Sequence, residues 1–552
     1  MTNRWLPKSV VLLKTYTAQA FVADLLAGVT VGLVALPLAM AFAISSGVPP
    51  QSGLYCAIVT GFLVSALGGS RFQIAGPTGA FVVVVAGIVA TYGVDGLFMC
   101  TMMAGVLLVV LGATGMGTAV KFIPRPVVVG FTNGIAVLIA STQIRDFLGI
   151  AVPVPSEFWP RMTTLATNAG TLSWPATALA ATTIVVLLVW RRLVPRVPGY
   201  IVALLGGTAA VVIFRLPVET IGTRFGGIPS GLPHIVVPRF RADLVPTLFR
   251  PALTVALLGA IESLMSAVVA DRMGNDRHNP NVELVAQGVA NIASPLFGGL
   301  PATGAIARTA TNIRSGARTP VSGMVHAATL VAVLLVAAPA ARFIPLSGLA
   351  AILLVVAYNV GDWGEIRELL KLSKMDISVW VVTFALTVFA DLTLAVELGM
   401  ILAMLLFIRK VSQTTTVSLV TPDYVEAGRV HILQDKKIPD YVSVFRIHGP
   451  FLFGATDKIS RIVDHVAELA PIVIVRLRNM TAIDATGLRA LEDLADRLHS
   501  SGRELILCGA PKQPAALMQQ SEFHEHVGEL NICANIEAAL ARASEIHQLI
   551  AP

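Results

Sequence analysis

Long apolar stretches occupy most of the chain between residues 20 and 410. A helix that spans a bilayer needs about 20 predominantly apolar residues. Because some stretches are long enough for two helices and others are interrupted, the pattern predicts roughly 14 membrane segments and hence a polytopic α-helical membrane protein. The clearest stretches are Leu25–Ile44, Phe81–Tyr92, Leu97–Leu111, Val127–Ile139, Ala176–Trp190, Ile201–Phe214, Leu253–Val269, Met324–Ala340 and Ile377–Phe407.

The apolar pattern stops near Arg409 and Lys410. A polar connector over residues 411–440 leads to residues 441–552, where strand and helix patterns alternate, which predicts a small α/β domain. This part contains no Gly-rich phosphate loop and no His/Cys/Asp cluster. The expected strands are Val442–Ile447, Ile472–Arg476 and Glu504–Cys508, and the expected helices are Asp457–Leu469, Thr486–Ser500, Pro514–Gln519 and Ile536–Ile546.

Composition agrees with a membrane protein. Of the 552 residues, 55% are hydrophobic and only 13% are charged, whereas soluble domains carry about 25% charged residues. The four cysteines, Cys56, Cys100, Cys508 and Cys533, have no metal-ligand spacing, so we expect free thiols, no metal and no cofactor.

The distribution of charge predicts the orientation in the membrane. The predicted inner loops hold 13 Lys and Arg against 8 in the outer loops, which obeys the positive-inside rule. With an even number of segments, both termini lie in the cytoplasm, and residues 1–19 form a cytoplasmic N-terminus without the features of a signal peptide. The net charge of +7 is therefore mostly a topology signal, and no clustered basic surface indicates nucleic-acid binding.

Two short segments nearly repeat each other 225 residues apart, namely Pro77–Ala80 and Ala302–Ala305. Each opens an apolar segment that is short or broken, and an apolar segment precedes each, with Pro37 41 residues before Thr78 and Glu262 41 residues before Thr303. Interrupted segments at matching places in two halves are typical of transporters built from inverted repeats, and they point to the substrate site. We therefore expect repeat 1 over about 20–215 and repeat 2 over about 250–410.

Several motifs together resemble the SulP (sulfate permease) anion transporter family. They are Ala-Leu-Pro-Leu-Ala-Met-Ala-Phe-Ala-Ile-Ser-Ser-Gly-Val-Pro-Pro-Gln-Ser-Gly at residues 35–53, Gly53-Leu54-Tyr55, Gly69-Ser70-Arg71 and Gly76-Pro77-Thr78. The run Ile483-Asp484-Ala485-Thr486-Gly487 resembles the turn of a STAS domain, the usual C-terminal partner in that family.

The resemblance implies a transporter rather than an enzyme. It implies seven plus seven inverted segments, divided into a core (segments 1–4 and 8–11) and a gate (5–7 and 12–14), with elevator-like movement of core against gate. It further implies a location in the bacterial inner membrane and assembly as a homodimer. Residues 20–410 would be the transport domain, and residues 441–552 would be a cytoplasmic STAS domain that can bind a protein partner.

The broken segments predict an anion site. The first amides of a helix lack internal partners and the helix dipole places partial positive charge there, so two helix starts facing each other can hold an anion. From the residues, we expect Thr78 and Gly79 on one side and Thr303, Gly304 and Ala305 on the other. The resemblance adds Phe42 as a lining residue and Arg308 as the basic residue of segment 10.

Glu262 lies midway along an apolar run, where an ionisable group is costly and functional by default. A charged carboxylate repels an anion, and burial favours its protonated form. We therefore predict that Glu262 couples anion transport to protons. We interpret Asp24 as an interface residue at the start of the first segment, and we assign Glu397 no role in transport.

Sodium is the alternative coupling ion. In the sodium-coupled bicarbonate branch of the family, Asp stands at the Glu262 position and oxygen-bearing side chains stand at those of Ser266 and Ile306. Ile306 has no oxygen to offer, and Leu38 replaces a Gln common after the segment-1 proline. The sequence around Glu262 and Arg308 resembles a proton-coupled branch associated with C4-dicarboxylates such as fumarate and succinate. Sulfate and bicarbonate remain alternative substrates.

A different class of function is a membrane-anchored scaffold that signals through its STAS domain. STAS regulators carry a phosphorylatable Ser at a turn where this chain has Ala485, which leaves only Thr486. We interpret Thr486 as the N-cap of the following helix.

Overall fold

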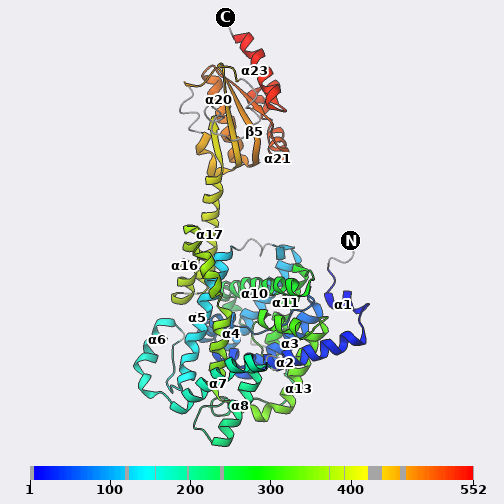
Figure 1. Cartoon of the computed structure of the whole chain (residues 1–552), viewed down its shortest axis with the longest axis vertical. Coiled ribbons are helices and arrows are strands. Elements are labelled where there is room, and N and C mark those ends of the chain that lie inside the picture. The colour runs from blue at the N-terminus through cyan, green and yellow to red at the C-terminus, as the bar shows by residue number, and fades with distance from the viewer. Residues whose placement is uncertain are drawn as a thin grey trace. The chain divides into compact units, whose positions relative to one another are not determined.

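A computed structural model of the chain describes residues 5–118, 124–155, 157–194, 198–235, 241–371, 373–390, 392–419, 438–459 and 468–550. It divides into two compact units, Met1–Ile401 and Leu402–Pro552. Each unit has its own architecture, helical in the first and α/β in the second (Figure 1).

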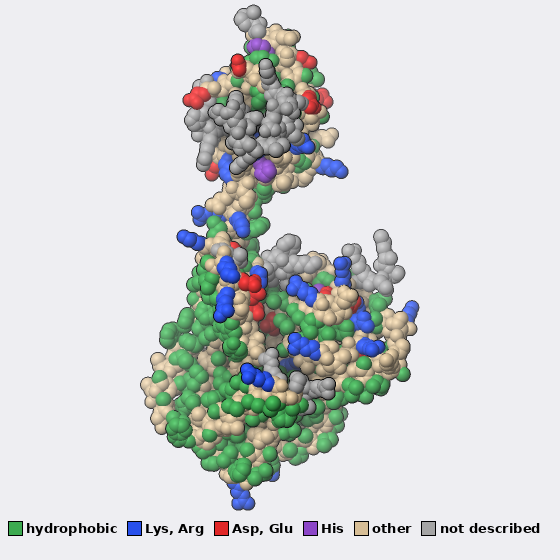
Figure 2. All heavy atoms as spheres, in the orientation of Figure 1, with side chains coloured by type: hydrophobic (Ala, Val, Ile, Leu, Met, Phe, Trp, Pro, Cys, Tyr) green, Lys and Arg blue, Asp and Glu red, His purple; other side chains and the backbone are tan. Residues whose placement is uncertain are grey.

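The first unit is mostly helical, and fourteen helical segments can be traced through its described residues and into α17. Among the described residues, seven helices are long and apolar enough to cross a membrane, and others are shorter or broken. Apolar side chains cover much of its visible surface (Figure 2). The segments are α2 (Ala18–Ser45), α3 (Pro50–Leu67), α4 (Gly79–Ala113, two segments joined at Gly93), α5 (Arg125–Leu148), α7 (Trp174–Leu193) and α8 (Gly199–Phe214), then α10 (Val245–Gly274), α11 (Pro280–Leu296), α12 (Ile306–Arg314), α13 (Val321–Ala341), α14 (Leu346–Val360), α16 (Lys374–Phe389) and α17 (Leu392–Thr414).

Shorter elements connect these segments. They are α1 (Lys8–Leu13), α6 (Phe158–Thr167), η2 (Ala169–Thr171), α9 (Ile221–Phe225), η3 (Ala242–Leu244) and α15 (Trp363–Leu369). With seven segments before residue 215 and seven after residue 244, the architecture confirms the predicted fold of a polytopic helical protein with two sets of seven.

The packing of the helices separates a core from a gate. In the core, α4 packs against α10 and α11, and α13 packs against α2 and α3. In the gate, α5 packs against α14 and α16, and α7 packs against α8 and α14. Arg250 of α10 also donates to both carboxylate oxygens of Glu397 of α17, at 3.1 and 2.6 Å.

Two broken segments meet inside the core. Strand β1 (Ala75–Gly76) precedes α4, strand β2 (Thr303–Gly304) precedes α12, and the two strands pair antiparallel. Gly93, with a positive φ of 72° that favours glycine, ends the first part of α4 and makes it a half-length helix. The repeated motif thus lies where two short helices start beside each other.

Asp24 is not an interface residue, as the sequence suggested, but is completely buried. Its carboxylate accepts hydrogen bonds from the backbone amides of Arg318 and Thr319, at 2.6 and 3.0 Å. The carboxylate of Glu283 likewise accepts hydrogen bonds from the backbone amides of Gly69 and Ser70, both at 3.0 Å. Because a buried carboxylate needs hydrogen-bond donors, each one ties a loop of one repeat to a helix of the other.

The second unit is an α/β domain. Its five-stranded sheet has the order β3-β4-β5-β6-β7, with β3 antiparallel to β4 and the other strands parallel. Its strands are β3 (Thr416–Leu419), β4 (Val442–Phe451), β5 (Ile472–Ile483), β6 (Glu504–Cys508) and β7 (Ile532–Cys533). Its helices are η4 (Phe453–Ala455), α20 (Ala485–Ser500), α21 (Lys512–Gln520), α22 (His524–Val527), η6 (Glu529–Asn531) and α23 (Ile536–Ile550).

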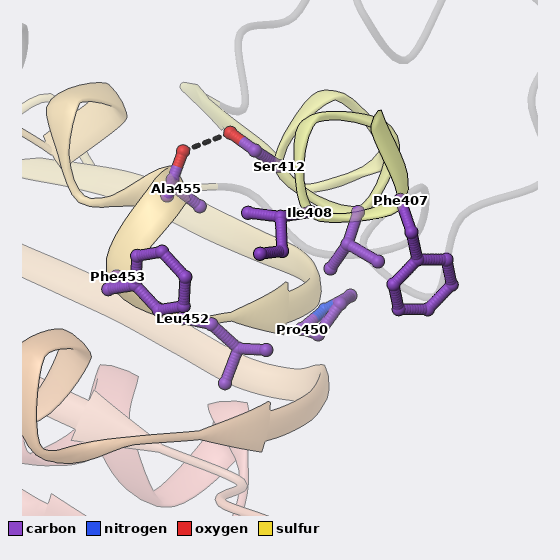
Figure 3. Close-up of a pocket in the computed structure, with 9 residues that line it drawn as sticks. Phe407, Ile408, Ser412, Pro450, Leu452, Phe453 and Ala455 are labelled. Carbon is purple, nitrogen blue, oxygen red and sulfur yellow. Dashed lines mark hydrogen bonds between the residues drawn. The ribbon is translucent and has the colours of Figure 1, made fainter. Parts of the chain in front are cut away.

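Each face of this sheet has its own apolar core. Side chains of β4, β5 and β6 pack with those of α20 on one face, and the alternate side chains pack with α23 on the other. The last turns of α17 lie beside the end of β4 across a cavity of about 290 Å³ with mostly apolar walls (Figure 3). The Ser412 hydroxyl bridges this cavity by donating to the Gly454 carbonyl oxygen.

Three details of this unit differ from the sequence prediction. Asp484, not Thr486, caps α20, because its carboxylate accepts a hydrogen bond from the Gly487 amide at 2.8 Å. Strand β3 lies inside the stretch predicted as a connector, and most of that stretch is outside the described residues. The predicted helix Asp457–Leu469 also falls largely outside them.

We predict that a chain ending at Gln413 still folds and binds its anion as the full chain does, because both broken segments lie within the first unit. Size-exclusion chromatography would show whether the truncated protein is folded, and calorimetric titration would measure its affinity for the anion. A monodisperse truncated protein without anion binding would contradict this division of labour.

Candidate anion site

Thr78 and Glu262 bring the two repeats together at the start of α4. The Thr78 hydroxyl donates a hydrogen bond to Oε2 of Glu262 at 3.0 Å. Thr78 holds the N-cap position of α4, yet its side chain does not bond the helix amides. The amides of Gly79 and Ala80 are thus the first of the helix, where no intrahelical acceptor exists.

Gly79 is enclosed by Phe42 of α2 and Ile139 of α5. A Cβ atom at this position would lie 2.7 Å from Cδ1 of Ile139 and 3.4 Å from the Phe42 ring. Because α5 belongs to the gate and α2 to the core, the start of α4 faces the boundary between them. The close packing of Ile139 against this backbone therefore requires glycine.

In the second repeat, the helix begins two residues later than the motif suggests. Helix α12 starts at Ile306 with Ala305 as its N-cap, so Thr303 and Gly304 are extended. The Thr303 hydroxyl lies 2.7 Å from that of Ser263, and Ser263 accepts a hydrogen bond from the Gly304 amide at 3.1 Å. Thr303 and Gly304 thus attach β2 to α10, and the first free amides of α12 follow them.

Gly304 faces the side chain of Gln73 rather than open space. A Cβ atom there would overlap the Gln73 amide group and lie 3.2 Å from Cα of Ser263. Both polar atoms of the Gln73 side chain are buried without a hydrogen-bond partner in the described structure. A larger residue at Gly304 would therefore displace Gln73 before it reached an anion.

Arg308 connects α12 to the segment in front of α4. Its side chain is 2% exposed, and Nη2 donates to the carbonyl oxygen of Pro77 at 2.5 Å. Nη1 is buried and has no hydrogen-bond partner in the described structure. The guanidinium lies so close to Gly76 that a side chain there would overlap Nη1. A full positive charge thus lies directly behind the start of α4.

Exposure distinguishes the residues that border accessible space from those that support them. Thr78 and Glu262 are half-buried, and Ile306 is 40% exposed. The other predicted site residues are buried, namely Phe42, Gly79, Thr303, Gly304, Ala305 and Arg308. Ile139, Ser263 and Gln73 were not predicted, because only the folded structure brings them beside the two helix starts.

Ser266 and Ile306 are the two positions that the sequence analysis compared with sodium ligands. The Ser266 hydroxyl donates to that of Thr309 at 3.2 Å, and the Ile306 side chain contains no oxygen. Within the described parts of the chain, no group of three or more His, Cys, Asp or Glu residues could hold a metal ion.

The sequence model described as the sulfate permease family matches residues 21–383, and that of the STAS domain matches residues 434–539. The chain belongs to the sulfate permease family. It is 42% identical over 519 residues to the protein named "Putative sulfate transporter YvdB" of Bacillus subtilis, which covers 94% of this chain and 96% of the relative. It is 32% identical to the bicarbonate transporter BicA of Synechocystis, over 94% of both chains.

Solved structures agree with this membership. The transmembrane domain of a cyanobacterial bicarbonate transporter BicA matches 69% of this chain and 98% of its own, with 35% identity and a TM-score of 0.62. The structure of SLC26A9 matches 98% of this chain and 93% of its own, with a TM-score of 0.86. Its identity is 17%, so it supports the fold alone. The chain is therefore a multi-pass anion transporter with a C-terminal STAS domain.

We predict that Gly79→Leu weakens anion binding more than about 100-fold, or about 2.7 kcal/mol, because the side chain would collide with Ile139 and Phe42 and close the approach to the helix start. Gly87→Leu is the matched control on the same helix, since a Cβ atom there meets nothing within 4 Å. Calorimetric titration of both purified variants would compare their affinities. Equal affinities would exclude the start of α4 as the binding surface.

We predict that Arg308→Ala weakens binding about tenfold, or about 1.4 kcal/mol, because the helix-start amides remain when the guanidinium is lost. Arg314→Ala, at the exposed end of α12, is the control. Calorimetric titration would measure the anion affinity of both variants. If Arg308→Ala abolished anion binding while Gly79→Leu bound the anion normally, a side-chain cation and not the helix terminus would hold the anion.

Proposed function

We propose that this protein is a proton-coupled symporter of a small oxyanion, with the anion bound at the starts of α4 and α12 and the proton carried by Glu262. The observation that supports this most is the hydrogen bond from Thr78 to Glu262, which joins the carboxylate to the first turn of α4. An anion at those amides would lie beside the carboxylate. Because like charges repel, binding of the anion and protonation of Glu262 would favour each other.

Protons fit the site better than sodium. A sodium ion needs several oxygen ligands, and the Ile306 side chain supplies none at its position. A carboxylate with one hydroxyl partner can accept a proton without further ligands. Glu262 in place of the shorter Asp of the sodium-coupled branch agrees with this choice.

Among possible anions, we favour sulfate or bicarbonate. Relatives over most of the chain carry these two anions in their names. The comparisons give no support to the C4-dicarboxylate expectation. The close approach of Phe42 and Ile139 to Gly79 also suits a compact anion better than a four-carbon chain.

The proposal places the protein in the inner membrane of a bacterium, with both termini in the cytoplasm. It includes a homodimer as the working assembly and a regulatory role for the STAS domain. A scaffold without transport is disfavoured, because Asp484 already caps α20 and Thr486 needs no phosphorylation to complete the turn.

Uptake into proteoliposomes would identify the substrate and the coupling ion. Labelled sulfate, bicarbonate and fumarate would each be tested under an imposed inward proton gradient and, separately, an inward sodium gradient. We expect sulfate or bicarbonate uptake driven by protons. Uptake driven by sodium alone would overturn proton coupling, and fumarate uptake alone would overturn the oxyanion assignment.

We predict that Glu262→Gln, which imitates the protonated carboxyl, still binds anion but loses acceleration by an inward proton gradient. Asp95→Asn removes an exposed carboxylate of α4 outside the site and is the matched control. Initial uptake rates at several external pH values would be compared. If Glu262→Gln retained the full pH dependence, Glu262 would not be the coupling group.

A further inference from the structure

Helix α1, near the start of the chain, has one face against the protein and one exposed face. It lies at the edge of the first unit, just before α2 (Figure 1). On the inner face, the Lys8 ammonium donates to both carboxylate oxygens of Asp276, each at 2.9 Å, and the Lys8 amide donates to the Gly68 carbonyl oxygen. The Ser9 hydroxyl donates to the Ala66 carbonyl oxygen. Helix α1 is thus attached to the end of α3 and to the loop after α10.

The exposed face of this segment is apolar. Leu6, Val10 and Leu13 are separated by four and three residues, which is the spacing of one helix face. Leu13 is 70% exposed, and Trp5 and Val11 are exposed beside these three. We call these five side chains the α1 face. So many large apolar side chains in one short segment are costly in water and indicate a partner that is itself apolar.

The nature of this partner follows from the helix that comes next. Helix α2 is long and apolar enough to cross a membrane, and exposed apolar side chains also occupy its first turns. They are Phe21, Val22, Leu25, Leu26 and Val29. Helix α1 has only six residues, whereas a spanning helix needs about 20, so α1 can lie at the surface of a bilayer but cannot cross it. The α1 face is therefore an apolar surface next to the lipid-exposed start of a spanning helix.

We propose that α1 is an anchor lying in the plane of the membrane, with the α1 face inserted among the lipids of the leaflet at the N-terminal end of α2. Helices of this kind place Leu and Trp on the lipid side and basic residues near the headgroups. Lys14, which is exposed at the end of α1, supplies such a basic residue. On the opposite face, the ion pair of Lys8 with Asp276 holds the anchor against the core. The proposal goes beyond the transport function and does not rest on it.

Spin labels on the full-length protein, in nanodiscs of phosphatidylcholine and phosphatidylglycerol, would show what covers the α1 face. A nitroxide would be attached at Leu13→Cys in a Cys533→Ser background, because Cys533 is the cysteine of the four that is not buried. Val22→Cys on α2 is the lipid control, and Arg314→Cys at the exposed end of α12 is the aqueous control. Power saturation would measure collisions with oxygen, which dissolves in lipid, and with a nickel chelate, which stays in water.

We expect the ratio of oxygen to nickel collision rates at Leu13 to match that at Val22. It should exceed the ratio at Arg314 at least about threefold, as insertion by about 5–10 Å into the leaflet would give. A ratio equal to that at Arg314 would place the α1 face in water and overturn the proposal. Protection of Leu13 from both reagents would mean that a second copy of the chain or another protein segment covers the face, and would overturn it as well. None of these outcomes depends on anion uptake.

The ion pair behind the helix gives a second test. In Lys8→Gln, the label at Leu13 should lose the immobilised part of its spectrum, because the attachment to Asp276 is gone. Lys14→Gln removes an exposed lysine of the same segment and should leave the spectrum unchanged. An unchanged spectrum in Lys8→Gln would overturn the role of the ion pair.

Trp5 supplies a probe that needs no label. Lipids with brominated acyl chains quench the emission of indole rings that touch them, so Trp5→Phe should lower the quenched part of the protein's fluorescence. An identical quenched part with and without Trp5 would contradict the insertion of the α1 face.

Discussion

The fold depends on the need to satisfy backbone groups where helices are broken inside a membrane domain. Unpaired amides and carbonyls are too costly in hydrocarbon, so non-helical backbone survives only where protein or a site supplies partners. Here β1 and β2 pair with each other, and side chains form hydrogen bonds with backbone groups around them. Ser263 accepts from Gly304, Asn291 bonds both the amide and the carbonyl of Ala302, and Thr309 accepts from Ile74. Thus the polar residues of α10, α11 and α12 make the two helix starts possible.

Much of this arrangement could be predicted from the sequence. The apolar pattern gave the number of segments, and the repeated motif located the broken helices, because small residues and prolines interrupt helices in a recognisable way. Side-chain partners that come from distant segments could not be predicted. Asp24 bonds amides almost 300 residues away, and Ile139 reaches Gly79 from the gate. Periodicity shows which residues are apolar, but not which loop a carboxylate will meet.

Smaller errors have local causes. The two copies of the motif look alike, yet α4 starts at Gly79 and α12 starts only at Ile306. The difference arises because Ser263 and the pairing with β1 hold Thr303 and Gly304 in extended form. At α20, Asp and Thr are both good caps, and Asp484 takes the position because the strand ends at Ile483. The residue at which a helix starts thus depends on the residues packed around it and not only on its intrinsic helix propensity.

Helices α2 and α10 differ at one position that bears on whether transport moves net charge. Counted from the repeated motif, Pro37 of α2 corresponds to Glu262 of α10, so these matching positions supply one carboxylate, not two. A single proton would fully balance a singly charged bicarbonate ion but only half of a sulfate ion. Sulfate uptake would then move net negative charge inward, against a membrane potential that costs about 2.3 kcal/mol per elementary charge for each 100 mV. Bicarbonate uptake would be indifferent to that potential.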